Sequence, residues 1–583
     1  MSHRDVEAGA ALLVESLRDA GVTHIFANFG SDHPAVIEAL ARDRERGITT
    51  PRVIVCPHEY TALSAAHGYA LATGQAQAVF VHTDVGTANL GGAVHNASRS
   101  KVPVFIFAGM TPYTLEGELP GSRNSHINSL QDAPDQHALV RQYVKWNYDL
   151  RTATNVPQIV QRSLQLARSA PAGPVYVTAA REVLAERAPR PRIDTWRWGA
   201  ISPVSVADRI VDELVEELRR ASFPLVVTSY VGRTRVAVAR LVEVAERLGV
   251  GVVEYNPDVM NFPRDHPLHL GDDPHAVIAE ADVIVVLDAD VPWVATMAAP
   301  DPEARIYVIN EDPLSERIPL LYVPADRYVR ADSASLLEQI LARAPRRGTP
   351  ETRRRTDVTR ARGAAIQQDW RETTERDVEA GRLTPESVSC AVTRAVGDDA
   401  IVLNEAISAA PAVWKNLVRH QPGTYYGNRG TSLGWSGGGA IGVKLAHPER
   451  FVVSIVGDGT FFFSVPSATY WIADQYDLPF LTIVLDNGGW NATKRNVLRQ
   501  YQRGTAERTD AFWSSLSQSA DFGGIASAAG DAVSEIVSEF DELDGALSRA
   551  ITAVEAGRSA VVTVRLDPIS RQPPEGRVRT SSA

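Results

Sequence analysis

The stretch Val452–Trp490, VVSIVGDGTFFFSVPSATYWIADQYDLPFLTIVLDNGGW, decides the fold that this sequence predicts. It contains two apolar runs, and each stops abruptly at polar side chains, the first at Asp458 and the second at Asp486 and Asn487. Short apolar runs of this kind, recurring between helical segments, predict buried strands of a parallel α/β sheet. Asp458 and Asn487 would then stand at the ends of two such strands.

The first strand end predicts a place for a phosphate and a cation. In parallel α/β sheets, ligands collect beyond the carboxyl ends of the strands. Gly457 and Gly459 would let the backbone approach a phosphate closely, and Thr460 would open the following helix. The carboxylate of Asp458, between the two glycines, can hold a divalent cation.

The second strand end predicts the remaining protein ligands of that cation. Asn487 offers a side-chain oxygen, and Gly489 in the turn that follows offers a backbone carbonyl. Together with Asp458, diphosphate oxygens and water, these would complete the octahedral shell that Mg²⁺ prefers. The alternative interpretation is that GDG and DNGG are ordinary tight turns.

Outside this stretch, the chain of 583 residues shows the same alternation of apolar runs and helical periodicity in three blocks. The expected domains are residues 1–186, 200–345 and 375–570, followed by a tail at 571–583. Polar stretches rich in Pro and Arg, at 187–199 and 342–363, predict linkers between them. The predicted fold class is therefore α/β, with three domains built on parallel sheets.

Composition excludes several classes of function. The formal net charge of -11 is spread along the chain, which disfavours a role in binding nucleic acid or a membrane surface. The two cysteines, Cys56 and Cys390, cannot build a disulfide framework or a thiolate metal site, and they fit a reducing cytoplasm. No apolar run approaches the length of a membrane span.

The pair of motifs, GDG followed about 30 residues later by a strand-terminal Asn, resembles the pattern of thiamine-diphosphate enzymes. Four longer segments resemble the benzoylformate decarboxylase and acetolactate synthase group: HEYTALSAAHGYALATG (58–74), HTDVGTANLGGAVHNA (82–97), LNEAISAAPAVW (403–414) and PGTYYGNRGTSLGWSGGGAIG (422–442). The resemblance implies pyrimidine-binding, central and diphosphate-binding domains, with thiamine diphosphate and Mg²⁺ as cofactors. It also implies an enzyme, a lyase, decarboxylase or carboligase.

The resemblance assigns roles around the cofactor. Glu59 matches the glutamate that bonds the aminopyrimidine ring and promotes removal of the thiazolium C2 proton. Leu433 matches the bulky apolar residue that bends the cofactor, and Ser408 matches a position that contacts the diphosphate. The alternatives are that Glu59 only begins a helix and that Leu433 only fills a core.

Four polar residues of the first domain are candidates for contact with the substrate. His82 resembles the proton-relaying histidine of benzoylformate decarboxylase, and Ser31 resembles its carboxylate-binding serine. His33 resembles the histidine that carboligating lyases present, and Gln131 resembles a glutamine shared by lyases and acetolactate synthases. Each of the four could instead be structural.

Departures from the family pattern limit what it implies. Asp486 stands where a second Asn is usual, and the glycine-rich flavin signature of catalytic acetolactate synthases is not evident around Gly232. Arg233 and Arg235 there could bind a nucleotide phosphate, although an exposed helical Arg pair is the commoner case. Acyl-CoA cleavage is in doubt because the segment after the GGW carries Lys and Arg where a carboxylate is expected.

The substrate expected is a 2-oxo acid, a 2-hydroxy ketone or a 2-hydroxyacyl-CoA. The alternatives are an acetolactate synthase-like enzyme that contains FAD and a non-catalytic regulatory homologue. The family places the pyrimidine on the Glu59 domain of one chain and the diphosphate on the Asp458 domain of another, which implies a homodimer at least and a homotetramer by resemblance. Small and apolar residues at 125–136 and after Gly430 suit such an interface.

Overall fold

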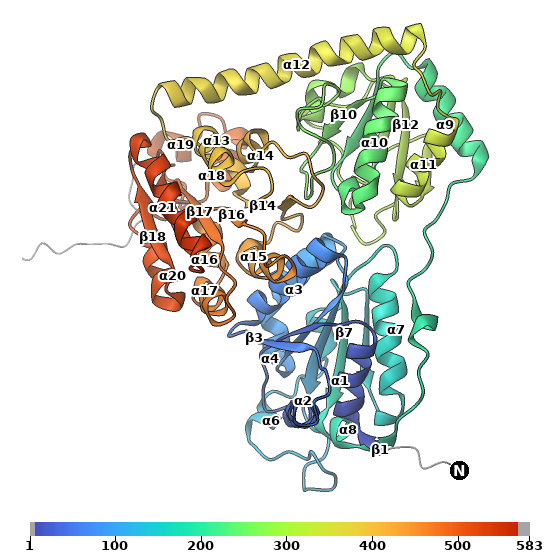
Figure 1. Cartoon of the computed structure of the whole chain (residues 1–583), viewed down its shortest axis with the longest axis vertical. Helices are drawn as coiled ribbons and strands as arrows, with labels where there is room; N and C mark the ends of the chain where they lie inside the picture. The colour runs from blue at the N-terminus through green and yellow to red at the C-terminus, as the bar shows by residue number, and fades with distance from the viewer. Residues whose placement is uncertain (1–5, 570–583) are drawn as a thin grey trace, which may run out of the picture.

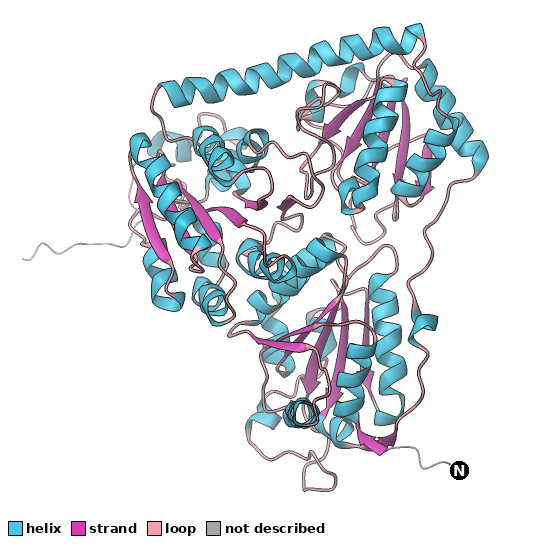
Figure 2. Ribbon diagram, in the orientation of Figure 1, coloured by secondary structure: helices cyan, strands magenta, loops and turns pink. Residues whose placement is uncertain are grey.

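The computed structural model describes residues 6–569 and contains three domains, each built on a parallel sheet with helices on its faces (Figures 1 and 2). The prediction of a three-domain α/β fold is confirmed. The predicted tail at 571–583 lies outside the described residues. Among residues 6–569, no helix combines the length and apolar character needed to cross a membrane.

The first domain holds a sheet of six parallel strands. In spatial order they are β3 (Arg52–Val55), β2 (His24–Ala27), β4 (Gln77–Val81), β5 (Val104–Met110), β7 (Val175–Ala180) and β6 (Trp146–Leu150). The main helices are α1 (Gly9–Asp19), α2 (Pro34–Glu45), α3 (Glu59–Thr73), α4 (Thr83–Asn89), α5 (Gly91–Arg99) and α7 (Val156–Arg168). The linker predicted to begin at residue 187 starts instead as a short strand, β8 (Arg187–Pro189), which pairs antiparallel with β1 (Val6–Ala8).

The central domain holds a sheet of five parallel strands. In spatial order they are β10 (Gly251–Glu254), β9 (Pro224–Thr228), β11 (Val283–Leu287), β12 (Arg305–Asn310) and β13 (Arg327–Arg330). Helices α9 (Asp208–Arg220), α10 (Arg235–Leu248) and α11 (Ser333–Arg343) accompany it. Its apolar strands form the centre of a core of their own.

The third domain again holds six parallel strands. In spatial order they are β15 (Tyr425–Gly427), β14 (Ile401–Glu405), β16 (Val452–Gly457), β17 (Leu481–Asp486), β19 (Ala560–Arg565) and β18 (Val533–Val537). Its main helices are α13 (Pro385–Val396), α14 (Ala410–Asn416), α15 (Trp435–Ala446), α16 (Asp458–Phe463), α17 (Pro466–Gln475), α18 (Asn491–Gln500), α20 (Phe522–Gly530) and α21 (Leu543–Glu555).

The first and third sheets have the same strand order. Counted along the chain within each domain, the order is second, first, third, fourth, sixth, fifth. The order reverses between the first and third strands, which are β2 and β4 in one domain and β14 and β16 in the other. Such a reversal opens a crevice beyond the carboxyl ends of the strands, where doubly wound folds bind ligands. Two candidate ligand sites of related construction therefore exist in one chain.

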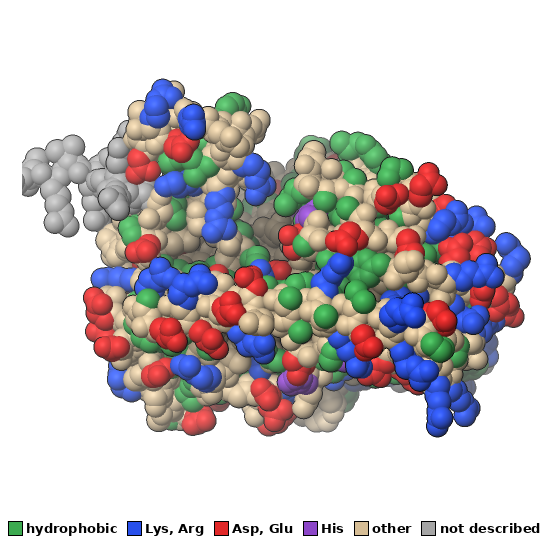
Figure 3. Space-filling model, turned by 90° about the horizontal axis from the view of Figure 1, so that it is seen from above, with side chains coloured by type: hydrophobic (Ala, Val, Ile, Leu, Met, Phe, Trp, Pro, Cys, Tyr) green, Lys and Arg blue, Asp and Glu red, His purple; other side chains and the backbone are tan. Residues whose placement is uncertain are grey.

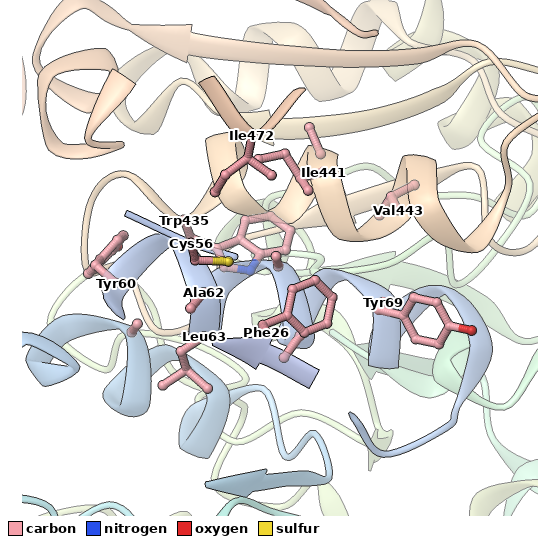
Figure 4. Close-up of a cluster of buried hydrophobic side chains, with 14 of the residues drawn as sticks. Phe26, Cys56, Tyr60, Ala62, Leu63, Tyr69, Trp435, Ile441, Val443 and Ile472 are labelled. Carbon is pink, nitrogen blue, oxygen red and sulfur yellow. The ribbon is translucent and has the colours of Figure 1, made fainter. Parts of the chain in front are cut away.

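Helices α3 and α15 join the first and third domains in a shared core (Figure 4). Tyr60 and Leu63 on α3 face the core to which Trp435 and Ile441 on α15 contribute. The helices approach closely because a Cβ atom at Gly442 would overlap the backbone of α3. The contact fixes the two domains relative to each other.

The predicted linker at 342–363 is largely helical. Residues 350–379 form α12 (Pro350–Glu379), whose first turn is capped by the Thr349 side chain and carries a proline at its first position. Gly363 lies against the backbone of the central domain, and Thr374 donates to Asn416 in the third domain. On the face that α12 occupies, acidic and basic side chains are interspersed (Figure 3).

Candidate active site

The carboxyl ends of β16 and β17 bring the predicted cation ligands together. Asp458 begins α16 directly after β16, and it interacts with Asp486 at the end of β17. Both carboxylates are buried, at 3% and 1% exposure. Each has one oxygen bonded to a nearby backbone N–H, from Gly459 to Asp458 at 2.8 Å and from Gly488 to Asp486 at 3.1 Å.

Three buried oxygen atoms at this edge have no hydrogen-bond partner among the described residues: Oδ2 of Asp458, Oδ2 of Asp486 and Oδ1 of Asn487. Burial, together with the negative charge of Asp486, raises the pKa of Asp458 to about 7. Unsatisfied buried acceptors of this kind are costly, and a hard cation satisfies them. The residues present therefore fit Mg²⁺.

The two glycines that flank Asp458 have different surroundings. A Cβ atom at Gly457 would meet no other atom within 4 Å, whereas one at Gly459 would overlap the ring of Trp490. Gly459 is therefore also required for packing against Trp490, and the approach of both glycines to a phosphate stays a prediction. The helix also begins at Asp458, two residues before Thr460.

Glu59 lies at the carboxyl edge of the first sheet, as the first residue of α3. Its carboxylate is buried, at 5% exposure, and is held by two amides that the sequence analysis did not identify. Asn28, after β2, donates to Oε1 at 2.9 Å, and Asn89, at the end of α4, donates to Oε2 at 3.0 Å. Each oxygen keeps a second lone pair for a ring nitrogen, so the position fits a pyrimidine contact.

His82 lies at the neighbouring strand end, after β4, and both of its ring nitrogens have partners. Nδ1 lies 2.6 Å from Oδ1 of Asp32, and Nε2 lies 3.0 Å from Oε1 of Gln131. The hydrogen bond to Asp32 raises the pKa of His82 above its ordinary value, against the opposing effect of burial. The structure therefore brings His82 and Gln131 together at the edge that carries Glu59.

The other two substrate candidates lie in the loop between β2 and α2, in different environments. Ser31 is exposed. The ring of His33 is 0% exposed, and its Nδ1 lies 2.8 Å from Asp32. The ring of His33 is thus enclosed in the single chain, and its contact with a substrate stays a prediction.

Ser408 and Leu433 are both half-buried; Ser408 lies in a short 3-10 helix (Ile407–Ala409), and Leu433 lies in the turn before α15. Ser408 follows β14 and accepts a hydrogen bond from Arg495 through its carbonyl oxygen. Leu433 is absent from the described core, and its carbonyl accepts from Tyr60 at 2.6 Å. Leu433 is thus a partly exposed apolar side chain just before α15, and its contact with a cofactor stays a prediction.

Two β-branched residues next to predicted site residues have left-handed backbones. Thr83, after His82, has φ of 37°, and Ile407, before Ser408, has φ of 48°. This conformation is costly for β-branched residues, and such strain concentrates at functional sites. It occurs here at both crevices, beyond the first sheet and beyond the third.

Arg233 and Arg235, the sequence candidates for a nucleotide phosphate, are engaged in contacts between domains. Arg233 donates to the carbonyl of Ser100, and Arg235 donates to the carbonyl of Ala72. The guanidinium groups therefore tie the start of α10 to the first domain.

A cavity of about 660 Å³ lies between the carboxyl edge of the central sheet and the loop after β14. Its ionisable lining comprises Asp258, Asp272, Asp273, Asp290, His275, Glu405, Arg99 and Arg429. Arg429 is paired with Asp290. This predominantly acidic lining is unfavourable for the phosphates of FAD or coenzyme A.

The residues that sequence reasoning missed are Asn28, Asp32 and Asn89, and Asp486 was noted only as a departure from the family pattern. Asn28 and Asp32 occupy the segment NFGSDHP, directly after a predicted strand and beside Ser31 and His33. Their position just after a predicted strand was the signal in the sequence that could have identified them as site residues. Their partners, however, lie 31 to 50 positions away in the chain.

Two protein-family models match the chain. Residues 7–139 match "Thiamine pyrophosphate enzyme, N-terminal TPP binding domain", and residues 408–564 match "Thiamine pyrophosphate enzyme, C-terminal TPP binding domain". These ranges contain Glu59 and His82 in the first case, and Asp458 and Asn487 in the second.

Known proteins are similar over nearly the whole chain. Benzoylformate decarboxylase of Pseudomonas aeruginosa is 28% identical, covering 95% of this chain and 98% of that protein. Acetolactate synthase isozyme 3 large subunit of Escherichia coli is 25% identical, covering 96% and 95%. A solved thiamine diphosphate-dependent 4-hydroxybenzoylformate decarboxylase of Rhodococcus jostii RHA1 shares the fold, with a TM-score of 0.77, 23% identity and coverage of 96% and 99%.

Proposed function

The chain belongs to the thiamine pyrophosphate enzyme family, and we propose that it uses thiamine diphosphate and Mg²⁺ to cleave the carbon–carbon bond beside the carbonyl of a 2-oxo acid. The observation that carries the proposal is the placement of Glu59 and His82 at one crevice and of Asp458 and Asn487 at the other. The relative named benzoylformate decarboxylase, similar over 95% of the chain, supports a 2-oxo acid as substrate.

When bound, thiamine diphosphate supplies an electron sink for carbon–carbon cleavage, and the protein supplies orientation and proton management. Asp458, Asn487 and the carbonyl of Gly489 would hold Mg²⁺ against the diphosphate. Glu59 would hold a proton between a carboxyl oxygen and the pyrimidine ring nitrogen. His82 would donate a proton from Nε2 to the reacting carbon or oxygen of the substrate.

The test is a screen of aliphatic and aromatic 2-oxo acids with protein loaded with thiamine diphosphate and MgCl₂. We expect release of CO₂ and an aldehyde or 2-hydroxy ketone, identified by mass spectrometry, that depends on both cofactors. A protein that binds the cofactor and cleaves none of these acids would favour the regulatory homologue. A flavin absorption in the purified protein would favour the acetolactate synthase-like alternative.

We also propose that two copies of the chain build each site, with Glu59 from one and Asp458 from the other. Large apolar side chains beside both crevices are exposed in the single chain, among them Leu130 next to Gln131, at 80%, and Phe463 against Trp490, at 53%. Apolar surface of this kind marks a covered face. A dimer is the minimum, and a tetramer is the proposed state.

Complementation tests the shared site. In a dimer of one Glu59→Gln chain and one Asp458→Ala chain, one of the two sites combines an intact Glu59 with an intact Asp458. We therefore expect co-expressed, tag-separated heterodimers to recover roughly half of the wild-type activity, although each homodimer is inactive. Inactive heterodimers, or a fully active monomer by light scattering, would contradict the proposal.

A further inference from the structure

Asp32 is a buried carboxylate to which sequence and family resemblance assign no role. It lies in the loop between β2 and α2, and its side chain is 2% exposed. Its Oδ1 lies 2.6 Å from Nδ1 of His82 and 2.8 Å from Nδ1 of His33, and its Oδ2 accepts from the backbone N–H of Thr83 at 3.2 Å. Burial opposes ionisation, but the hydrogen bonds from His33 and His82 outweigh it and hold the pKa of Asp32 well below its ordinary value.

The two partners of His82 determine where its protons are. Nδ1 faces the carboxylate of Asp32, and Nε2 faces the amide oxygen of Gln131. Each of these oxygens requires an N–H on the ring, so the arrangement fits a ring protonated at both nitrogens. We propose that Asp32 is a positioning residue, which fixes the His82 ring and holds it as an imidazolium. When substrate is bound, the Nε2–H of this ring donates its proton to the substrate instead of bonding Gln131.

The surroundings of Asp32 leave its charge available to His82. Nε2 of His33 is buried and has no hydrogen-bond partner among the described residues, so a second ring proton there would be unsatisfied. Nδ1 of His33 also accepts a hydrogen bond from the backbone N–H of Gly30 at 3.2 Å, and of the two rings beside Asp32, that of His82 makes the shorter contact, 2.6 Å against 2.8 Å. Asp84 on α4 also acts on His82 through space and raises its pKa, in the same direction as Asp32 does.

The backbone around the pair is built for this contact. A Cβ atom at Gly109 on β5 would overlap the carboxylate of Asp32, and one at Gly30 would overlap the His82 ring. The bond from Thr83 to Asp32 also holds the left-handed turn, φ 37°, that directly follows His82. Asp32 therefore orients His82 in two ways, through its ring and through its backbone.

The inference rests on the proposed role of His82 in proton transfer, and its test does not require turnover. The variant is Asp32→Asn, which keeps the shape and an acceptor oxygen but removes the charge. Protein with ¹³C-labelled histidine is titrated by NMR, and the His82 signal is assigned by its loss in His82→Gln. We expect the pKa of His82 to lie above about 6.5 in the wild type, and its proton affinity to fall on the order of tenfold or more in Asp32→Asn.

Asp84→Asn is the matched control, because it removes the other facing carboxylate without touching the ring. We expect it to shift the His82 signal less than Asp32→Asn does. Equal titration of His82 in wild type and in folded Asp32→Asn, checked by circular dichroism, would overturn the inference, as would a larger shift in Asp84→Asn. Neither result depends on whether the substrate proposed above is correct.

Where a 2-oxo acid is turned over, the pH profile gives a second readout. The imidazolium is the donating form, so activity is present below the pKa of His82 and is lost as pH rises through it. Removing Asp32 lowers that pKa, and the alkaline limb of kcat should move to lower pH by a comparable amount. A uniform fall in kcat with an unmoved limb would show a purely structural role for Asp32.

Discussion

Replacing Asp458 by alanine is expected to abolish the Mg²⁺-dependent binding of thiamine diphosphate. Asp458 provides the carboxylate between the two glycines at the end of β16, and its Oδ2 is buried with no hydrogen-bond partner in the part of the chain that the structure describes. Loss of residues that only support a metal ligand costs roughly 10- to 100-fold in affinity, so loss of a ligand should cost at least about 100-fold. Calorimetry with thiamine diphosphate and MgCl₂ measures this loss of affinity.

Two controls accompany this variant. Asp486→Asn restores the usual asparagine at the neighbouring position, and because it leaves Asp458 and Asn487 in place, the cofactor should still bind. The apo form of Asp458→Ala should unfold at the same temperature as the wild type or higher, since a buried, incompletely paired carboxylate is removed. Unchanged cofactor affinity in Asp458→Ala would refute the assignment of the cation site.

Replacing Glu59 by glutamine is expected to leave cofactor binding within about 10-fold while lowering kcat by roughly 10²- to 10⁴-fold, the usual contribution of a general acid or base. The amide keeps the shape of the carboxyl group beside Asn28 and Asn89 but cannot exchange a proton with a ring nitrogen. Calorimetry measures the affinity for the cofactor, and steady-state decarboxylation of a 2-oxo acid measures kcat.

The matched control is Glu254→Gln, a buried glutamate of the central domain that bonds Asn261 and His269. It removes a carboxylate of similar burial away from both crevices, so it should lower stability and leave kcat of the folded protein near the wild-type value. Wild-type kcat in Glu59→Gln would remove Glu59 from the chemistry.

The sequence predicted the strands that carry long apolar runs, and with them the three sheets. β4, β9, β11 and β17 are buried along their whole length, which is why their composition alone reveals them. The edge strands β6, β13, β15 and β18 were not predicted. In β6, β13 and β18, polar and exposed side chains such as Arg327, Tyr328 and Glu535 obscure the pattern, and β15 has only three residues.

The site residues were predictable where they form a motif of consecutive residues. They were much less predictable where their role depends on contacts between residues far apart in the sequence. The GDG turn and Asn487 lie at strand ends, which the apolar runs locate. The partnership of Asp32 with His82 exists only because the strand order brings β2 beside β4, and Glu59, after β3, meets Asn28 and Asn89 because β2 lies between β3 and β4. His33 and Asp32 are adjacent in sequence and both are buried, and only the contact of 2.6 Å between Oδ1 of Asp32 and Nδ1 of His82 shows which of them bonds the catalytic candidate.

Hydrogen–deuterium exchange at C2 of bound thiamine diphosphate tests the central claim most directly, because it reports the proton chemistry that both crevices must assemble and requires no substrate. The exchange is measured by quenched flow and NMR on the wild-type protein with Mg²⁺. We expect exchange at least about 10²-fold faster than in the free cofactor at the same pH. Exchange at the rate of the free cofactor, with the cofactor fully bound, would contradict the account.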